Sequence, residues 1–443
     1  MTKRFLCGLL LLAISCMAQS AGRPSRPLVL ISIDGLRPDY VAQADQHGLK
    51  IPNLRLFLRK GSYASGVDGV TPTVTYPSHT TLVTGVSPAR HGIEANTTFD
   101  PLNRNAIGWY WYSEDIKVPT LWDMASDAGM VSANVHWPVT VGARITYNLP
   151  QIWRTGTEDD RKLLRALSTP GLLAFLEHEI GPYADGISET IEGDENRARF
   201  AVWLVEQKKP GLMLAYFTAL DHTQHETGPF SPQSCAVLER IDAIVGKMLQ
   251  AAMKAYDGRA VVAIVSDHGF VQTTHDVNLM TAFRETGLVR FDSDKITSWD
   301  ATFWPAGGSA AIVLKDPSNS EVAGKVKAML ESLASNPESG VDKILDRAEI
   351  QRLEGFSTAT FLVNLKPGYK LAFNATGPLV TNTPVNGMHG YLPSPEMRSA
   401  FLVMGPGIAE GKDLGEIDMR NIAPTLAGIL GLKLSQAEGK PLF

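Results

Sequence analysis

The sequence predicts an α/β protein whose mostly parallel central sheet is covered by helices on both faces, with smaller inserted α+β segments. Short, continuous apolar runs recur along the chain, which is typical of strands that are buried on both faces. Helical patterns lie between them, and strands that alternate with helices at these lengths form parallel sheets. The apolar runs are 28–35, 211–221, 259–269, 309–314 and 399–405. The helical patterns are 52–61, 120–130, 234–256 and 419–432.

The N-terminus has the pattern of a secretory signal peptide. Lys3 and Arg4 precede an apolar core that ends in small residues, and this core is too short to stay in a bilayer as a helix. We therefore expect residues 1–20 to be removed and the mature chain to be secreted or periplasmic, without a transmembrane segment. A lipid anchor through Cys16 ranks second, because the residues before it fit a lipoprotein signal poorly.

Cysteine and charge usage exclude other classes of protein. Removal of residues 1–20 leaves Cys235 as the last of 3 cysteines, so we expect no internal disulfide. The net charge of -5 is modest and no basic run stands out, which makes double-stranded nucleic acid an unexpected partner. A small-molecule substrate is expected instead, and the sequence leaves the oligomeric state open.

Residues 21–443 are expected to form one domain. Two regions fit the alternation of strands and helices badly. Residues 140–200 mix aromatic, glycine and acidic segments, and residues 290–385 have the pattern of a small α+β insertion. We interpret both regions as elaborations at the rim of the sheet.

Three of the predicted strands end in an aspartate: Asp34, Asp221 and Asp267. In an open α/β sheet, the carboxyl ends of the strands border the ligand crevice. A single aspartate at such a position often only begins a turn. Three of them on separate buried strands, two with histidines close by, indicate a shared site.

Histidines complete a set of candidate metal ligands. His225 lies four residues after Asp221, and His268 directly follows Asp267. His389 lies in the segment NGMHGY, where glycines let the backbone bend closely around a ligand. Imidazole nitrogens together with carboxylate oxygens suit zinc, with manganese or iron in one site as an alternative. The expected sites are Asp221, His225 and His389 around one ion, and Asp34, Asp267 and His268 around the other.

The stretch TPTVTYPSHTTLVTG, residues 71–85, is rich in hydroxyl groups and has little helical tendency before its far end. A hydroxyl that contacts the second ion would lose its proton, as bound water does when its pKa falls to about 7. It would then be a nucleophile, although most of these threonines are expected only to bond the backbone in a turn. Spacing leaves five residues open for the role: Thr71, Thr73, Thr75, Thr80 and Thr81.

Six segments stand in the order of the motifs of one known family: ISIDGLRPDY, TPTVTYPSHTTLVTG, ARHGIEANTTFDP, YFTALDHTQHETGP, SDHGF and MHGY. Together they span residues 28–391, which is most of the mature chain. They resemble the alkaline phosphatase superfamily, and within it the nucleotide pyrophosphatase/phosphodiesterase (type I phosphodiesterase) family. Six ordered segments are more specific than any one of them.

The resemblance assigns roles to individual residues. The family places its nucleophile in a Thr-aromatic-Pro-x-His segment, which selects Thr75 as both catalytic residue and metal ligand. The resemblance also implies that the amide of Asn96 donates to a phosphoryl oxygen. It implies, finally, that Tyr76 and Tyr216 hold a nucleobase between their rings.

The chain departs from the family pattern beside the expected ligands. Ser78 stands where the family often has asparagine, and Thr223-Gln224 stand where Ser-Gly is frequent. Neither change removes a ligand. The additional histidines His79 and His222 are expected to lie outside the ligand sets.

These expectations combine into a secreted di-zinc phosphodiesterase/nucleotide pyrophosphatase that forms a phosphothreonine at Thr75 and releases nucleoside monophosphates. The enzymatic alternative is a phosphocholine-diester, phosphonate or phosphomonoester hydrolase on the same di-metal scaffold. The non-enzymatic alternative is a secreted binding protein that has lost catalysis. A sulfatase is disfavoured, because the chain has no Cys-x-Pro-x-Arg or Ser-x-Pro-x-Arg segment.

Overall fold

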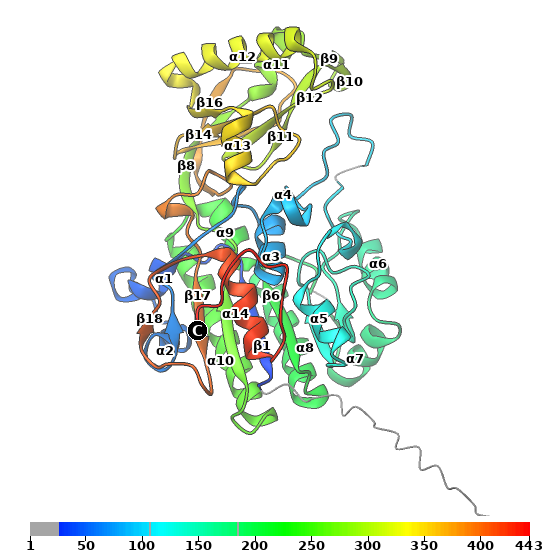
Figure 1. The fold of residues 1–443 in the computed structure, drawn as a ribbon, viewed down its shortest axis with the longest axis vertical. Helices are drawn as coiled ribbons and strands as arrows, with labels where there is room; N and C mark the ends of the chain where they lie inside the picture. The colour runs from blue at the N-terminus through cyan, green and yellow to red at the C-terminus, as the bar shows by residue number, and fades with distance from the viewer. Residues whose placement is uncertain (1–25, 106–107, 184–185) are drawn as a thin grey trace, which may run out of the picture.

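The computed structural model describes residues 26–105, 108–183 and 186–443 (Figure 1). An eight-stranded sheet lies at its centre, with the strand order β18-β2-β17-β7-β1-β6-β4-β5. β17 pairs antiparallel with β2 and β7, and the other pairs are parallel, which confirms the predicted fold class. The strands are β1 (Leu28–Ile33), β2 (Ser62–Tyr63), β4 (Ser132–Val135), β5 (Tyr147–Leu149), β6 (Leu212–Phe217), β7 (Val261–Val265), β17 (Phe401–Met404) and β18 (Lys412–Asp413).

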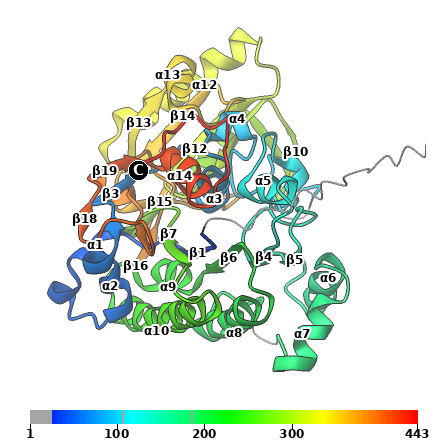
Figure 2. The ribbon, with the colours of Figure 1, turned by 60° about the horizontal axis from the view of Figure 1, so that its bottom comes forward.

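Helices cover both faces of this sheet. They include α2 (Pro52–Lys60), α5 (Leu121–Asp127), α8 (Ile191–Lys208), α10 (Pro232–Ala255) and α14 (Ile422–Ile429). Side chains of β1 alternate between two hydrophobic cores. Val29 and Ile31 belong to the core that contains residues of α8 and α10, whereas Leu28 and Leu30 belong to the core that contains residues of α5 and α14. Figure 2 shows the two helical layers on opposite sides of the strands. This double burial explains the continuous apolar run of β1.

The hydroxyl-rich stretch is more helical than its sequence predicted, because residues 75–84 form helix α3 (Thr75–Thr84). The hydroxyls of Thr80 and Thr84 donate to the carbonyls four residues earlier, at 2.8 and 2.7 Å. Pro77 lies in the first turn, where a missing N–H costs no helical hydrogen bond. Every residue of α3 is buried, so tertiary packing overrides the weak local propensity.

A smaller α+β unit follows β7 and has a hydrophobic core of its own (top of Figure 1). Its antiparallel sheet has the order β11-β12-β14-β13, and a three-stranded sheet has the order β15-β8-β16. The predicted strand 309–314 forms β12 here and not a strand of the central sheet, because an apolar run alone does not distinguish these two buried environments. The elements are β8 (Val271–Val277), α11 (Leu279–Glu285), β9 (Val289–Asp292), β10 (Lys295–Trp299), β11 (Ala301–Pro305), β12 (Ser309–Leu314), α12 (Ser320–Ser335), β13 (Val341–Leu345), α13 (Arg347–Leu353), β14 (Phe361–Leu365), β15 (Tyr369–Leu371) and β16 (Val380–Met388).

The other irregular region, residues 140–200, contains β5 at the edge of the central sheet, α6 (Asp159–Leu167), α7 (Leu172–Ile180) and the start of α8. A single domain over residues 21–443 stays a prediction. Cys235 is a free, half-buried cysteine. Across the described ranges, no helix is long and apolar enough to cross a membrane. The predicted signal peptide and the alternative anchor Cys16 lie outside the described residues.

Candidate active site

The three predicted carboxylates lie at the carboxyl ends of three adjacent strands. Asp34 directly follows β1, and Asp267 follows β7 after one residue. Asp221 lies in the first turn of helix α9 (Ala219–Thr227), which follows β6. Gly35 turns the chain after Asp34 with φ +67°, and a Cβ on it would lie 2.8 Å from the amide of Gln224. The parallel order β7-β1-β6 thus brings the three side chains to one edge of the sheet.

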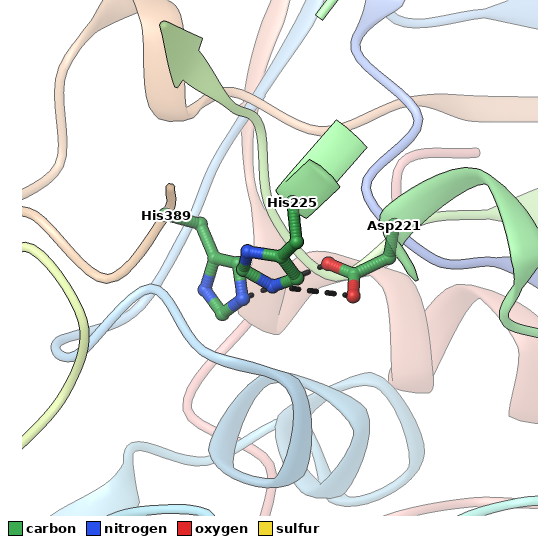
Figure 3. A group of neighbouring side chains, drawn as sticks. All are labelled: Asp221, His225 and His389. Carbon is green, nitrogen blue, oxygen red and sulfur yellow. Dashed lines mark ion pairs between the residues drawn. The ribbon is translucent and has the colours of Figure 1, made fainter. Parts of the chain in front are cut away.

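The structure brings together the first predicted ligand group. Asp221 and His225 lie one helical turn apart on α9, and His389 directly follows β16. The Nε2 atom of His225 is 3.4 Å from Asp221 Oδ2, and that of His389 is 3.6 Å from Asp221 Oδ1. In Figure 3 the three side chains point toward one another. Their donor atoms lie within 4.8 Å of one another, close enough to hold a metal ion.

His268 is the centre of the second group. Its Nε2 atom lies 3.2 Å from Asp267 Oδ2, 3.4 Å from Asp34 Oδ1 and 3.9 Å from Asp221 Oδ1. Within 4.8 Å, the set that could hold an ion is Asp34, Asp221 and His268, so Asp221 lies between the two groups. The sequence had placed Asp267 in this set. The hydroxyl of Thr75 is 3.4 Å from His268 Nε2, which brings the predicted nucleophile to this group.

Buried oxygens without partners test whether these residues fit metal ions. One oxygen of Asp34 accepts a hydrogen bond from Tyr216, and Oδ1 of Asp267 accepts one from the N–H of Gly35 at 3.1 Å. Among the described residues, the opposite oxygens Asp34 Oδ1 and Asp267 Oδ2 have no hydrogen-bond partner, and neither has Asp221 Oδ1. A buried carboxylate is costly unless it is paired or coordinates a metal, so the set fits cations.

The pKa values of these carboxyl groups agree with that interpretation. Burial raises the pKa of Asp34 and of Asp221 well above the usual value, and repulsion from the neighbouring carboxylates raises both further. Burial acts on Asp267 in the same direction, but His268 and His79 hold its pKa below the usual value. Without a cation, Asp34 and Asp221 therefore resist ionisation. A bound cation favours the ionised form.

The histidines present lone pairs to the same space. In each of them Nδ1 faces a backbone carbonyl, which only accepts, so Nδ1 carries the proton and Nε2 is free to bind a metal. Burial lowers the pKa of all three, that of His225 to about 4, which keeps the rings neutral. Nε2 lone pairs that face carboxylate oxygens repel them unless a cation lies between. The pairs are His225 with Gly387 O at 3.1 Å, His268 with Gly269 O at 3.2 Å and His389 with Thr73 O at 3.2 Å.

Thr75 and Asn96 face each other across the start of α3. Thr75 is the first residue of this helix, where backbone N–H groups lack helical partners and favour an anion. The N–H of Tyr76 donates to Asn96 Oδ1 at 2.9 Å. This bond defines which side-chain atom of Asn96 is the oxygen, so its NH2 group remains a donor.

The predicted role of the two tyrosines as a nucleobase clamp does not fit their positions. Tyr76 is fully buried and its hydroxyl donates to Gln151 at 2.8 Å. Tyr216 is 2% exposed and donates to Asp34, while its ring packs on His79. A tyrosine on a strand whose two faces are both covered has no open ring face, so the core-packing alternative for Tyr216 fits better.

His79 and His222 lie outside both ligand groups. His79 uses Nδ1 on the carbonyl of Thr75 and Nε2 on the hydroxyl of Ser32, each at 2.8 Å. His222 turns from α9 toward Glu189 and Glu226, at 3.5 and 3.6 Å. The ring of His79 therefore supports the nucleophile's backbone, and that of His222 belongs to the rim of the site.

Sequence reasoning missed the aromatic rim beside Asn96. Trp109 is half-buried, and its ring centroid lies 5.2 Å from that of Tyr76 and 5.2 Å from that of Trp153, which is also half-buried. Trp111 packs against Tyr76 and Trp153 and is buried. The dense aromatic run GWYWY, which begins twelve residues after Asn96, was the available signal.

The strand ends of this α/β sheet bring together carboxylates, neutral imidazoles and a hydroxyl at a helix N-terminus. This combination defines a class of metal-dependent hydrolases that act on phosphate esters. The family model of type I phosphodiesterase / nucleotide pyrophosphatase matches residues 28–392. The chain belongs to this family. The predicted membership in the alkaline phosphatase superfamily and the predicted enzyme class, hydrolases of phosphodiester and pyrophosphate bonds, are thereby confirmed.

Relatives with curated names agree. The human bis(5'-adenosyl)-triphosphatase ENPP4 is 24% identical over 92% of this chain and 78% of its own length. Human ectonucleotide pyrophosphatase/phosphodiesterase family member 5 is 26% identical over 62% of this chain. An uncharacterized pyrophosphatase/phosphodiesterase of Schizosaccharomyces pombe is 25% identical over 63% of this chain. The matches span about half the length of the last two relatives, 52% and 50%.

Solved structures support the fold. Human ENPP5 superposes with a TM-score of 0.67 at 22% identity, over 94% of this chain and 97% of its own. Murine ENPP5, as an inactive variant in complex with AMP, superposes with the same TM-score at 20% identity. The predicted sheet architecture is thus a known one.

Proposed function

We propose that this chain hydrolyses phosphodiester or pyrophosphate bonds of nucleotides with two Zn²⁺ ions, through a phosphothreonine at Thr75, and releases nucleoside monophosphates. The observation that carries the proposal is the set of three buried, unpartnered carboxylate oxygens that face neutral imidazoles beside that hydroxyl. Family membership supports the reaction class.

Two donor sets would hold the ions. Asp221, His225 and His389 would bind one, and Asp34, Asp267, His268 and Thr75 would bind the other, with the position of Asp221 allowing it to approach both. Mixed nitrogen and oxygen donors suit zinc, and manganese or iron suits the same donors. When bound, the two cations stabilise the charge of an in-line displacement and lower the pKa of the hydroxyl and of water.

The chain's own groups account for the remaining chemistry. The oxygen of Thr75 attacks phosphorus as the bond to the leaving oxygen breaks, and water later cleaves the phosphothreonine and restores the hydroxyl. The N-terminal N–H groups of α3 favour the anionic phosphoryl group. The NH2 group of Asn96 donates to a non-bridging oxygen, and such donors are worth roughly 3 kcal/mol in a transition state.

Nucleotides are the substrate class that the rim and the relatives support. Trp109 and Trp153 offer half-buried aromatic faces near Asn96, in place of the two buried tyrosines. Stacking on such faces contributes roughly 1–3 kcal/mol per base and tolerates every base. ENPP4 is named as a triphosphatase of a dinucleotide, and the murine ENPP5 structure contains AMP. Export through residues 1–20 belongs to the same proposal.

Replacement of Thr75 by alanine tests the nucleophile. Hydrolysis of p-nitrophenyl thymidine monophosphate should fall by about 10³-fold or more, because the covalent route is lost. T84A is the matched control, since Thr84 lies at the far end of the same helix. Undiminished turnover by T75A would contradict the assignment.

Metal analysis and substrate choice separate the alternatives. Metal analysis of the purified protein should find about two zinc ions per chain, and EDTA should abolish turnover until Zn²⁺ is restored. A diester nitrophenyl substrate should be cleaved faster than nitrophenyl phosphate. The opposite order would favour the phosphomonoesterase alternative, and no turnover on any phosphoester would favour a binding protein.

A further inference from the structure

A short loop before α8, residues 186–190, is fixed to the helix that carries Asp221 and His225. Arg197 of α8 is fully buried and donates to the carbonyls of Gly186 and Ser188 at 2.9 and 2.7 Å. Its guanidinium also donates to the hydroxyl of Thr218 at 2.8 Å, directly before α9. One side chain therefore sets the position of the loop relative to the site.

Glu189 is the charged residue that this loop presents at the rim. Its carboxylate lies 3.5 Å from Nδ1 of His222, the neighbour of Asp221 on α9, and the side chain is 47% exposed. The carboxylate of Glu226 approaches the other nitrogen of His222 at 3.6 Å, so the charge of this corner is negative. Burial is the largest cause of the raised pKa values of Asp221 and Tyr76, and the charge of Glu189 raises both further. The contact with His222 places the Glu189 carboxylate at the rim of the site, beside the turn of α9 that carries Asp221.

The two donor sets would have different roles in the proposed reaction. Thr75 attacks from the group around His268, at 3.4 Å. In an in-line displacement between two cations, one cation stabilises the attacking oxygen and the other the leaving oxygen. The leaving group therefore departs on the side of Asp221 and His225, where Glu189 lies.

We propose that Glu189 determines specificity by charge, so that the chain prefers substrates whose leaving group carries no free phosphate over nucleoside triphosphates. This inference rests on the function proposed above. A leaving pyrophosphate brings additional negative charge toward the carboxylate of Glu189, whose loop Arg197 fixes through the carbonyls of Gly186 and Ser188. A nucleoside or an aryl alcohol carries no free phosphate, so it brings less negative charge toward Glu189. The interaction crosses a partly solvated rim, so its effect on selectivity is moderate and screened by salt.

Neutralising Glu189 tests the inference by the ratio of two substrates. For the wild type, E189Q and E189K, kcat/KM is measured with ATP and with p-nitrophenyl thymidine monophosphate at alkaline pH, where imidazoles are uncharged. The ratio of kcat/KM for ATP to kcat/KM for the ester should rise about three- to tenfold in E189Q and further in E189K. High salt should shrink the difference between variants. The matched control is E192Q, since Glu192 lies three residues away but pairs with Arg240 at 2.8 Å.

Each outcome has one meaning. An unchanged ratio in both Glu189 variants, or an equal change in E192Q, overturns the inference while the ester is still hydrolysed. A change that persists at high salt overturns the electrostatic cause. If the wild type cleaves neither substrate with zinc present, the proposed function fails, and the inference fails with it.

Discussion

At the scale of single residues, the site consists of buried carboxylate oxygens and of the neighbouring groups that orient them. Asp34 and Asp267 each accept a hydrogen bond from a protein donor with one oxygen, and the other oxygen has no partner and faces the centre of the site. The three neutral histidines are oriented by backbone carbonyls in the same way. Donors and acceptors behind the expected ligands thus decide where the lone pairs point.

Tyr216 illustrates this at one side chain. It donates to Asp34 from a fully covered strand. Y216F should weaken Zn²⁺ binding by roughly tenfold, because partners of metal ligands contribute about 10–100-fold to affinity. The measurement is competition for zinc with a chelator of known affinity, alongside kcat/KM. Y256F is the control, since the buried Tyr256 donates to Pro210 at 2.6 Å, away from the site. Equal affinities in Y216F and the wild type would contradict the role.

At the scale of elements, the site depends on how α8 and α9 are joined. Asp194 and Arg197 lie one turn apart on α8, both fully buried, and form an ion pair. Asp194 also accepts the N–H groups of Thr218 and Ala219, at 3.0 and 2.9 Å, which begin α9. The helix that carries Asp221 and His225 is therefore anchored to its neighbour by a buried charge pair.

Removing one member of this pair should be costly. R197M should lower the free energy of unfolding by about 3–5 kcal/mol, because it leaves the Asp194 carboxylate buried and unpaired. Urea denaturation measures the loss. R240M is the control, since Arg240 pairs with Glu192 and Glu195 while 44% exposed, and such pairs contribute about 1 kcal/mol or less. Similar losses of unfolding free energy in R197M and R240M would show that burial of the Asp194–Arg197 pair does not increase its contribution to stability.

The elements also show what the sequence could predict. Continuous apolar runs identified β1, β6 and β7, and the aspartates after them identified the strand ends, because both signals are local. The helicity of α3 was not predictable, since it depends on burial of every residue of the helix. The assignment of β12 to the smaller sheet and the burial of Tyr216 depend on strand order, which local patterns do not contain.

At the scale of the whole molecule, strands β7, β1 and β6, helices α3 and α9, and the smaller α+β unit all contribute to one site. His389 comes from the end of β16 in that smaller unit, and α9 packs against β16. Nε2 of His389 lies 3.6 Å from Asp221, which belongs to the larger body. Metal ions at these residues would connect the two parts, so their removal should affect global stability and not activity alone.

Stability should therefore depend on metal and pH together. Asp34 and Asp221 have raised pKa values in the folded, metal-free chain. Their contribution is fully present below the unfolded pKa of about 4 and is lost as pH rises through the folded values. The histidines have lowered pKa values, so they oppose this only below about pH 6.5, their unfolded value. Above that pH the neutral histidines no longer oppose the effect of the carboxyl groups.

We expect the difference in melting temperature between zinc-loaded and EDTA-treated protein to widen as pH rises. As pH rises from about 4 through the raised pKa values of Asp34 and Asp221, EDTA-treated protein should lose stability through these carboxyl groups, whereas zinc-loaded protein keeps them ionised at the cations. Thermal unfolding of both forms at several pH values measures the gap, and a D34N variant should reduce its slope, because the amide does not titrate. A gap that stays constant or narrows with pH would mean that Asp34 and Asp221 do not hold cations.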